Sequence, residues 1–355
     1  MAIHFHKLTV KDIRRETPDC VSIAFDIPAE LQKEFKFIQG QNITIKTNLD
    51  DTRRSYSICS SPLENELRVA VKKINNGVFS SFANDKLKVG DTLEVMSPTG
   101  TFYTEVNPSN QKEYVFFAAG SGITPIISII KTILTTEVKS NVTLIYGNKN
   151  LASIIFKEEL ESLKDKHLEK FRVYHILSRE KTESDLNNGR IDLSKCDRVS
   201  ELIKFDSVDE FFICGPEQMI FTVRDFLEGW GIDSKKIHFE LFTTPTREHT
   251  KIYTAVKETS EEGSAITVKL DGRTFEFNLD YNGNAILDAA LAEGADAPFA
   301  CKGGVCCTCK AKILEGEVEM ESNYGLDKSE VKAGFVLTCQ SHPRSRKVVV
   351  DYDAT

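Results

Sequence analysis

The sequence predicts a multi-domain chain: a small antiparallel β-barrel, an α/β domain built on a parallel sheet, and a small α+β module at the C-terminal end. Two observations carry this prediction. The pattern of apolar residues changes twice along the 355 residues, and four cysteines lie within nine residues near the C-terminus. A chain of this length has room for several domains, each with its own core.

Residues 1–106 contain short β-rich runs such as VSIAFDI, NITIKTN and ELRVAVKKI, separated by turn residues. Such spacing is typical of a small antiparallel barrel. In residues 107–243, apolar strand candidates (YVFFAA, VTLIYGN, FRVYHIL, DEFFICG) alternate with helical stretches such as PIISIIKTILTTE. This alternation indicates a parallel sheet with helices on its faces.

Residues 244–265 are polar and have no sustained apolar period, so we expect a linker there. From residue 266 to 355 we expect a compact module. It begins with the hairpin pattern ITVKLDGRTFEFNL, which turns at Asp271-Gly272.

Composition excludes some classes of function. The net charge of −8, from 45 Lys and Arg against 53 Asp and Glu, disfavours a nucleic-acid partner. The N-terminus lacks a signal-peptide pattern, and the longest apolar stretch is interrupted by Gly, Ser, Thr and Pro, so we expect no membrane span. Nine unevenly spread cysteines fit poorly with a disulfide framework, which favours a reducing cytoplasm.

The segment APFACKGGVCCTCKAK, residues 297–312, has the C-x4-C-x2-C spacing of plant-type [2Fe–2S] sites, and FVLTCQ adds a distant fourth cysteine. Two irons need four thiolates, and glycines at 303 and 304 let the loop bend around them. The expected ligands are Cys301, Cys306, Cys309 and Cys339. Cys307 lies where this spacing needs no ligand. Zinc is the main alternative, but its sites favour paired C-x2-C units and only one is present; free structural cysteines are the other.

Two stretches of the barrel have the residues of a cofactor site. In RRSYSICSSP, Arg54 can pair with a phosphate, Tyr56 can lie against a flat ring, and Ser57 can bind a polar ring edge. In KKINNGVFSSFANDKL, Gly77 precedes a helix expected to begin near residues 79–81, whose first amides, with Ser80, suit a pyrophosphate. The alternatives are a strand with one solvated face and an ordinary serine-capped helix.

Two strand-to-helix turns in the α/β domain are expected at the same edge of the sheet, where open α/β sheets bind ligands. In AAGSGITPI, Gly120 and Gly122 let phosphates approach the backbone, and Pro125 fits the first turn of a helix. This is not the G-x-G-x-x-G fingerprint, and the strand VTLIYGN does not end in a carboxylate. The second turn is Cys214-Gly215-Pro216, where Cys214 has a buried structural thiol as its alternative role.

In this order, RxYS, GSGITP and CGP resemble the ferredoxin–NADP reductase superfamily, and the C-terminal module resembles plant-type ferredoxin, a β-grasp fold. The resemblance covers essentially the whole chain. It implies FAD in the barrel, NAD(P)H in the second domain and a [2Fe–2S] cluster in the third. The implied contacts are Arg54, Tyr56 and Ser57 to the flavin, Gly77 to Ser80 (including Phe79) to the FAD pyrophosphate, and Thr124 and Cys214 near flavin and nicotinamide.

The resemblance also bears on the nucleotide and the partner. Ser178 and Arg179 resemble the pair that holds the 2′-phosphate in NADP-dependent members, which favours NADPH over NADH; a solvated Arg–Glu loop is the alternative. Stretches such as RRSYSIC, GRID, ACKGGVC and EGEVEMESNYGL look most like the reductase subunits of ring-1,2-phenylacetyl-CoA epoxidases, which implies a partner oxygenase and phenylacetate catabolism. One departure is visible. Gln39 replaces the proline of the F-x-P-G-Q pattern, so we expect a less rigid turn.

The implied activity is electron transfer. Nicotinamide gives up two electrons as a hydride, a cluster accepts one, and a flavin converts between them. No side chain is needed as an essential acid or base, so we expect all seven histidines to be structural or surface residues. A reductase for another electron-transfer, ferric or haem acceptor stays open. So does an iron–sulfur redox sensor, although no output module such as a DNA-binding basic helix is evident.

Overall fold

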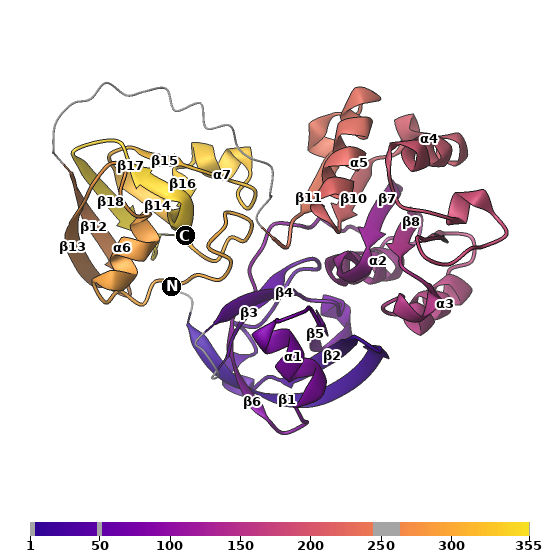
Figure 1. Ribbon diagram of the computed structural model, residues 1–355, viewed down its shortest axis with the longest axis horizontal. Helices are drawn as coiled ribbons and strands as arrows, with labels where there is room; N and C mark the ends of the chain where they lie inside the picture. Colours follow the sequence, from indigo (N-terminus) through magenta and orange to yellow (C-terminus); the bar gives the residue numbers. More distant parts are fainter. Residues whose placement is uncertain (1–3, 48–51, 244–262, 355) are drawn as a thin grey trace. The chain divides into compact units, whose positions relative to one another are not determined.

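The computed structural model describes residues 4–47, 52–243 and 263–354. Most of the chain divides into two compact units, Phe5–Leu241 and Phe242–Thr355 (Figure 1). The first unit holds the barrel and the α/β domain, and the second holds the C-terminal module. In the described part of the chain, no helix has the length and apolar character that crossing a bilayer requires.

The barrel is an antiparallel sheet of six strands in the order β4-β3-β6-β1-β2-β5. The sheet closes on itself where Ile58 pairs with Val69 and where the Cys59 amide donates to the Arg68 carbonyl at 2.8 Å. The predicted barrel is therefore confirmed. Its elements are β1 (Phe5–Thr17), β2 (Cys20–Asp26), β3 (Asn42–Lys46), β4 (Arg53–Ser57), β5 (Leu67–Lys72), α1 (Val78–Asp85) and β6 (Thr92–Met96).

The α/β domain has a five-stranded sheet in the order β11-β10-β7-β8-β9, and every neighbouring pair is parallel. This confirms the predicted sheet, because each of the four apolar runs became one of its strands. The strands are β7 (Glu113–Ala119), β8 (Asn141–Asn148), β9 (Phe171–Leu177), β10 (Glu210–Cys214) and β11 (Ile237–Glu240). The helices are α2 (Ile123–Thr136), α3 (Lys157–Lys166), α4 (Leu193–Leu202) and α5 (Glu217–Gly229).

The barrel and the α/β domain share a hydrophobic core. Isoleucines of α2 belong to the same buried cluster as Cys20, Cys59 and Phe102 from the barrel side. Because a shared, close-packed core resists relative movement, the barrel and the α/β domain keep a fixed position relative to each other.

The C-terminal module has a five-stranded sheet in the order β13-β12-β18-β14-β16, in which β12 and β18 are parallel. Its hairpin turns where predicted, with positive φ at Asp271 (52°) and Gly272 (68°), as a two-residue type I′ turn requires. The elements are β12 (Ser264–Leu270), β13 (Arg273–Leu279), α6 (Ile286–Ala292), β14 (Lys310–Glu315), β15 (Val318–Met320), α7 (Lys328–Lys332), β16 (Phe335–Leu337), β17 (Ser341–Pro343) and β18 (Lys347–Asp351).

The start of this module differs from the prediction. β12 begins at Ser264, two residues before the expected start, because Ser264 is buried and pairs with Leu279 of β13. The rest of the expected linker, residues 244–262, lies outside the described residues.

Candidate functional site: two redox centres

The two predicted turns of the α/β domain lie in direct contact. A Cβ at Gly122 would stand 2.1 Å from the Cys214 carbonyl oxygen and 2.7 Å from the Gly215 nitrogen. Any larger residue would force β7 and β10 apart at their carboxyl ends. Gly122 therefore has a packing role, and the phosphate approach expected there from the sequence stays a prediction.

Other residues of the first turn hold its shape. Gly120 has a φ of +54°, and its carbonyl accepts a hydrogen bond from the Tyr146 hydroxyl at 3.0 Å. Thr124 is buried and donates to the Ser121 carbonyl at 3.0 Å, while Pro125 lies in the first turn of α2 as predicted. The result is a rigid turn with glycine backbone at the carboxyl edge of the sheet, as a dinucleotide site requires.

The second turn contains a buried thiol. Cys214 is fully buried, and loss of hydration raises its pKa well above the ordinary value. The thiol therefore stays protonated at neutral pH and is a poor nucleophile. Cys214 packs directly beside Gly122, and the turn continues through Gly215 to Pro216, the N-cap of α5.

The strand β4 presents the barrel half of this site. Tyr56 packs against Phe79 of α1 with ring centroids 5.4 Å apart. Arg54 is exposed, and Nη1 donates to the Arg53 carbonyl at 2.8 Å. The Ser57 hydroxyl donates to Glu240 Oε2 at 3.0 Å, so β4 of the barrel is joined to the last strand of the α/β sheet.

Glu240 is the residue that sequence reasoning missed. It ends β11, and burial raises the pKa of its carboxyl to about 8, even though the hydrogen bond from Ser57 opposes the shift. A carboxyl that is largely protonated at neutral pH can donate or accept a proton at this junction. The signal in the sequence is the run IHFE, an apolar strand that ends in a carboxylate.

The start of α1 fits a phosphate group. α1 begins at Val78, one residue before the expected range, with Gly77 as its N-cap, and no side chain caps the helix. The Ser80 hydroxyl is turned into its own loop, where it accepts from the Ile74 amide at 3.3 Å. The first-turn amides, rather than the Ser80 hydroxyl, are therefore the groups available to a pyrophosphate.

Gln39, which replaces the proline of the F-x-P-G-Q pattern, stabilises its turn through its side chain. The Gln39 side chain is buried, and Nε2 donates to the Thr104 carbonyl at 2.7 Å. The turn that we expected to be less rigid without proline is thus held by a side-chain hydrogen bond.

Ser178 and Arg179 follow β9, which lies two strands from β7 in the sheet. Both side chains are exposed. The loop is fixed by backbone bonds from Ser178 to Asn148 at 2.9 Å and from Arg179 to Lys149 at 2.8 Å, while the Glu180 carboxylate accepts from the Leu151 amide at 2.8 Å. With strands about 4.8 Å apart, these residues lie roughly 10 Å along the edge from the first turn, toward the adenosine end of a dinucleotide.

The second centre is in the C-terminal module. The Cys301 and Cys306 sulfurs are 3.2 Å apart, and the pKa of Cys301 is lowered first by the Cys306 thiol and then by the Cys339 thiol. The pKa of Cys309 is lowered chiefly by its contact with Cys339. The four predicted cysteines therefore lie together, with amides of Gly303 and Cys306 directed at the Cys301 sulfur at 3.3 and 3.5 Å.

This arrangement suits two irons better than one. Thiols arranged in neighbouring pairs match a binuclear cluster, in which each iron takes two thiolates. The loop reaches this shape with positive φ at Lys302 (51°) and Gly304 (74°). At position 304, a Cβ would come within 2.8 Å of the Ser322 carbonyl.

Cys307 points elsewhere. Its thiol donates to the Gly325 carbonyl at 2.7 Å and belongs to the hydrophobic core of the module. The neighbouring cysteine therefore has a packing role that the spacing alone did not specify.

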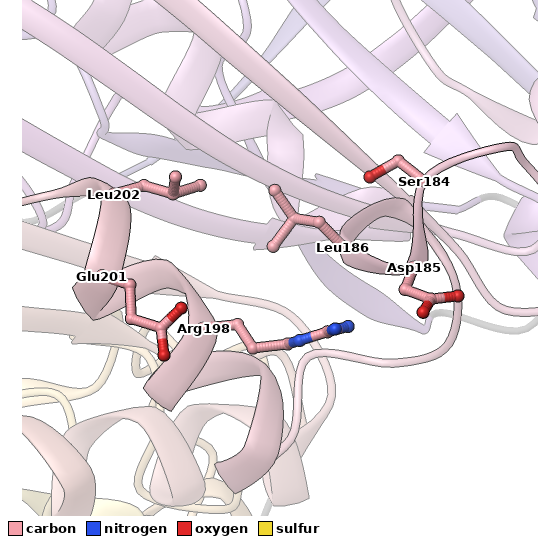
Figure 2. Close-up of a pocket in the computed structure, with 6 residues that line it drawn as sticks. All are labelled: Ser184, Asp185, Leu186, Arg198, Glu201 and Leu202. Atoms are coloured by element: carbon pink, nitrogen blue, oxygen red, sulfur yellow. The ribbon is translucent and has the colours of Figure 1, made fainter.

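A hollow of about 310 Å³ lies apart from the predicted site residues (Figure 2). Figure 2 shows Ser184, Asp185 and Leu186 on the loop after β9, opposite α4, which contributes Arg198, Glu201 and Leu202. The loop is held by the buried Lys195 ammonium, which donates to three of its carbonyls at 2.7–3.0 Å. Because the lining mixes both charges and the Asp185 and Leu186 carbonyls are already bonded to Lys195, we assign the hollow no binding role.

Three domain families match the chain in the predicted order. They are an oxidoreductase FAD-binding domain over residues 7–103, an oxidoreductase NAD-binding domain over residues 116–225, and a 2Fe-2S iron-sulfur cluster binding domain over residues 268–344. Fold and sites together define an NAD(P)H-dependent flavin iron–sulfur reductase of the ferredoxin–NADP reductase type. The cofactors expected from the sequence, FAD, a nicotinamide dinucleotide and a [2Fe–2S] cluster, are confirmed at the level of these domains.

The chain is 46% identical over 353 residues to a subunit of the 1,2-phenylacetyl-CoA epoxidase of Escherichia coli (strain K12), covering 99% of this chain and 98% of that protein. It is 32% identical to the ferredoxin reductase component of 3-ketosteroid-9-alpha-monooxygenase of Rhodococcus rhodochrous, covering 97% and 96%. The fold of phthalate dioxygenase reductase matches with a TM-score of 0.59 at 24% identity, covering 98% of both chains. This chain belongs to the family of that 1,2-phenylacetyl-CoA epoxidase subunit, as the sequence resemblance predicted.

Proposed function

We propose that this chain is the reductase component of a multicomponent oxygenase, and that its partner is a phenylacetyl-CoA epoxidase acting in phenylacetate catabolism. The observation that carries the proposal is one polypeptide with a flavin–nicotinamide site in one unit and four convergent thiols in the other. The 46% identity to an epoxidase subunit over nearly the full length supports the choice of partner.

When bound, FAD accepts a hydride from the nicotinamide and releases electrons one at a time toward the [2Fe–2S] cluster. The residues of the chain bind and orient. Tyr56 and Phe79 form an aromatic wall for the flavin, and the first amides of α1 hold its pyrophosphate. Ser57 and Glu240 form a hydrogen-bonded pair where barrel and sheet meet, and there the Glu240 carboxyl can exchange a proton as charge arrives.

We also propose that Cys301, Cys306, Cys309 and Cys339 are the cluster ligands and that Cys307 is not. Support comes from the sulfur contacts among the four and from the Cys307 hydrogen bond to Gly325. Backbone amides directed at the Cys301 sulfur favour its thiolate form, which is the form that binds iron.

NADPH is the proposed donor. Arg179 is exposed, and within the described residues its guanidinium makes no hydrogen bond or ion pair, so it is available to a 2′-phosphate. The nearest carboxylate in sequence, Glu180, accepts a hydrogen bond from the Leu151 amide through Oε2, which ties it to its own loop.

The proposed domains follow the predicted boundaries, with the module starting at Ser264. Residues 1–106 bind FAD, 107–243 bind NAD(P)H, 244–263 link, and 264–355 hold the cluster. From Ile266 onward there are 10 Lys and Arg against 14 Asp and Glu, so the module is acidic and can be steered toward a basic face of the oxygenase. We propose a cytoplasmic location, since the nine cysteines, each within the described residues, are free and the cluster ligands must stay reduced.

Truncation near residue 250 tests whether electrons reach the oxygenase through the C-terminal module. The shortened flavoprotein should oxidise NAD(P)H with ferricyanide at the rate of the full chain, and it should no longer drive epoxidation by the purified oxygenase. Full support of epoxidation by the shortened form would mean that electrons leave from the flavin, contrary to the proposal. Epoxidation of phenylacetyl-CoA by the oxygenase from the same cell, compared with hydroxylation of other substrates, tests the choice of partner.

A further inference from the structure

Helix α2 carries a polar stripe toward the barrel. Ser128 donates to the Ser60 carbonyl at 2.6 Å, and the hydroxyls of Thr132 and Ser61 lie 2.8 Å apart. Between them, the Lys131 ammonium pairs with Glu64 at 2.9 Å. Three consecutive polar contacts therefore join one helix of the α/β domain to one short segment of the barrel, residues 60–64. In Figure 1, α2 lies where the parallel sheet meets the barrel.

Burying these polar groups costs free energy unless each of them forms its hydrogen bond. Ser128 is completely buried and Thr132 is 5% exposed, on a helix that otherwise presents mainly isoleucine and leucine to the core. Apolar surfaces can slide past one another with little change in energy, whereas a buried hydroxyl is satisfied only at one separation and angle. The stripe therefore selects one position of α2 relative to the barrel.

Both ends of this connection are close to the reacting groups. On the helix, Ser128 follows Thr124 by one turn, and Thr124 belongs to the glycine turn that contacts Cys214. On the barrel, Ser60 follows Ser57 by three residues, and Ser57 ends the flavin strand. A shift of α2 would thus move the nicotinamide turn relative to the flavin strand.

We propose that Ser128 and Thr132 are positioning residues for hydride transfer: their hydrogen bonds to the segment after β4 set the distance between the nicotinamide turn and the flavin strand. The inference rests on the proposed function, because it concerns the hydride step of that reaction. Rates of hydride transfer fall steeply with small misplacements of the reacting atoms, so loss of one such bond has a kinetic effect beyond its effect on folding.

The chain offers a matched control on the same helix. Thr132 and Thr135 each donate to the carbonyl four residues earlier, at 2.7 Å in both cases. Only Thr132 also reaches the barrel, through Ser61. Thr132→Val and Thr135→Val therefore remove the same hydroxyl and the same local bond, but Thr132 is buried against the barrel whereas Thr135 is exposed.

The full-length holoenzyme is measured by anaerobic stopped-flow reduction of the flavin with saturating NADPH, and by the difference spectrum that NADP⁺ induces in the bound flavin without turnover. For Thr132→Val we expect flavin reduction to slow about tenfold and the amplitude of the difference spectrum to fall by more than half. The FAD content should be unchanged, and the NADP⁺ Kd should stay within about twofold, because the adenosine end still binds. Thr135→Val should match the wild type, and Thr132→Ser, which keeps the hydroxyl, should restore both signals.

The proposal is overturned if Thr132→Val slows reduction no more than Thr135→Val does, or if its difference spectrum is that of the wild type. Should Thr132→Val fail to fold, Ser128→Ala is measured in the same way against Thr135→Val, with the same two expected changes and the same outcomes against the proposal. A wild-type protein whose flavin is not reduced by NADPH or NADH would contradict the proposed function itself.

Discussion

The two redox centres are built in different ways. In the C-terminal module, three of the four convergent cysteines lie within nine residues of one loop, and the fourth is in the short turn after β16. In the larger unit, the predicted site is shared among β4, α1, the two glycine turns and the loop after β9. The first centre depends mainly on local backbone shape, and the second depends on how two domains pack.

This difference explains which contacts each centre depends on for its shape. The cluster loop needs positive φ at Lys302 and Gly304 and amides that point inward. The flavin–nicotinamide site needs contacts between residues far apart in sequence, such as Ser57 with Glu240 and Gly122 with Cys214. A local centre is sensitive to single ligands, and a shared centre is sensitive to the groups that join its parts.

The largest expected effect is on the local centre. Replacing Cys339 by Ser should remove nearly all bound iron, because a [2Fe–2S] cluster needs four thiolates and the neighbouring Cys307 thiol is bonded to the Gly325 carbonyl. The matched control is Cys307→Ser, which keeps a donor for the Gly325 carbonyl and should leave iron per chain unchanged. Iron analysis and the visible spectrum decide. Loss of iron in the Cys307 variant with retention in the Cys339 variant would reverse the ligand assignment.

The next effect concerns Glu240, at the junction of the shared centre. Burial raises the pKa of Glu240 to about 8, against 4.5 in the unfolded chain. As pH rises from 4.5 to 8, the unfolded chain loses this proton and the native protein keeps it, so native stability falls, by an upper limit of about 5 kcal/mol. Glu240→Gln removes this titration. Its free energy of unfolding relative to the wild type should rise between pH 5 and pH 8 and level off above pH 8. A difference independent of pH would show that Glu240 titrates normally.

Glu210, the first residue of β10, provides a test in which the pKa shift has the opposite sign. Burial alone would raise its pKa, but hydrogen bonds from His238, Lys112 and Thr104 outweigh burial and lower it to about 2. Its ionised form therefore stabilises the native protein above pH 4.5, by less than about 3 kcal/mol because water screens part of the interaction, and this is lost as pH falls toward 2. Glu210→Gln should destabilise the protein at pH 7 in urea titrations, with a deficit that shrinks below pH 4.5. A deficit that is constant from pH 7 to pH 3 would contradict this account.

The smallest effect is on nucleotide choice. Arg179→Ala should lower kcat/KM for NADPH roughly tenfold, since a charged hydrogen bond to the 2′-phosphate is lost, and should leave NADH within about twofold. The control is Arg172→Ala. Arg172 is an exposed arginine near the start of β9, the strand that precedes Arg179, and its replacement should change neither kcat/KM value. Equal losses for both nucleotides in the Arg179 variant would remove its proposed role in recognising the phosphate.

The sequence by itself determined the elements and the local centre. Apolar runs of seven residues such as EYVFFAA became buried parallel strands, and Asp271-Gly272 became the hairpin turn, because strand burial and positive φ are read from residue type and spacing. The cysteine spacing likewise placed four thiols together, since a short glycine-containing loop has few ways to fold around them.

Tertiary structure decided what distant residues do to one another. Glu240 ends an ordinary strand, and only its position beside Ser57 and its loss of hydration give it a raised pKa. At Gly122, only the folded structure shows that the Cys214 carbonyl occupies the space of the missing side chain. Ser128 and Thr132 are two polar residues in an apolar helix, and only packing sets them against the barrel. Hydration and contact distance are properties of the folded neighbourhood, and no local pattern of residues contains them.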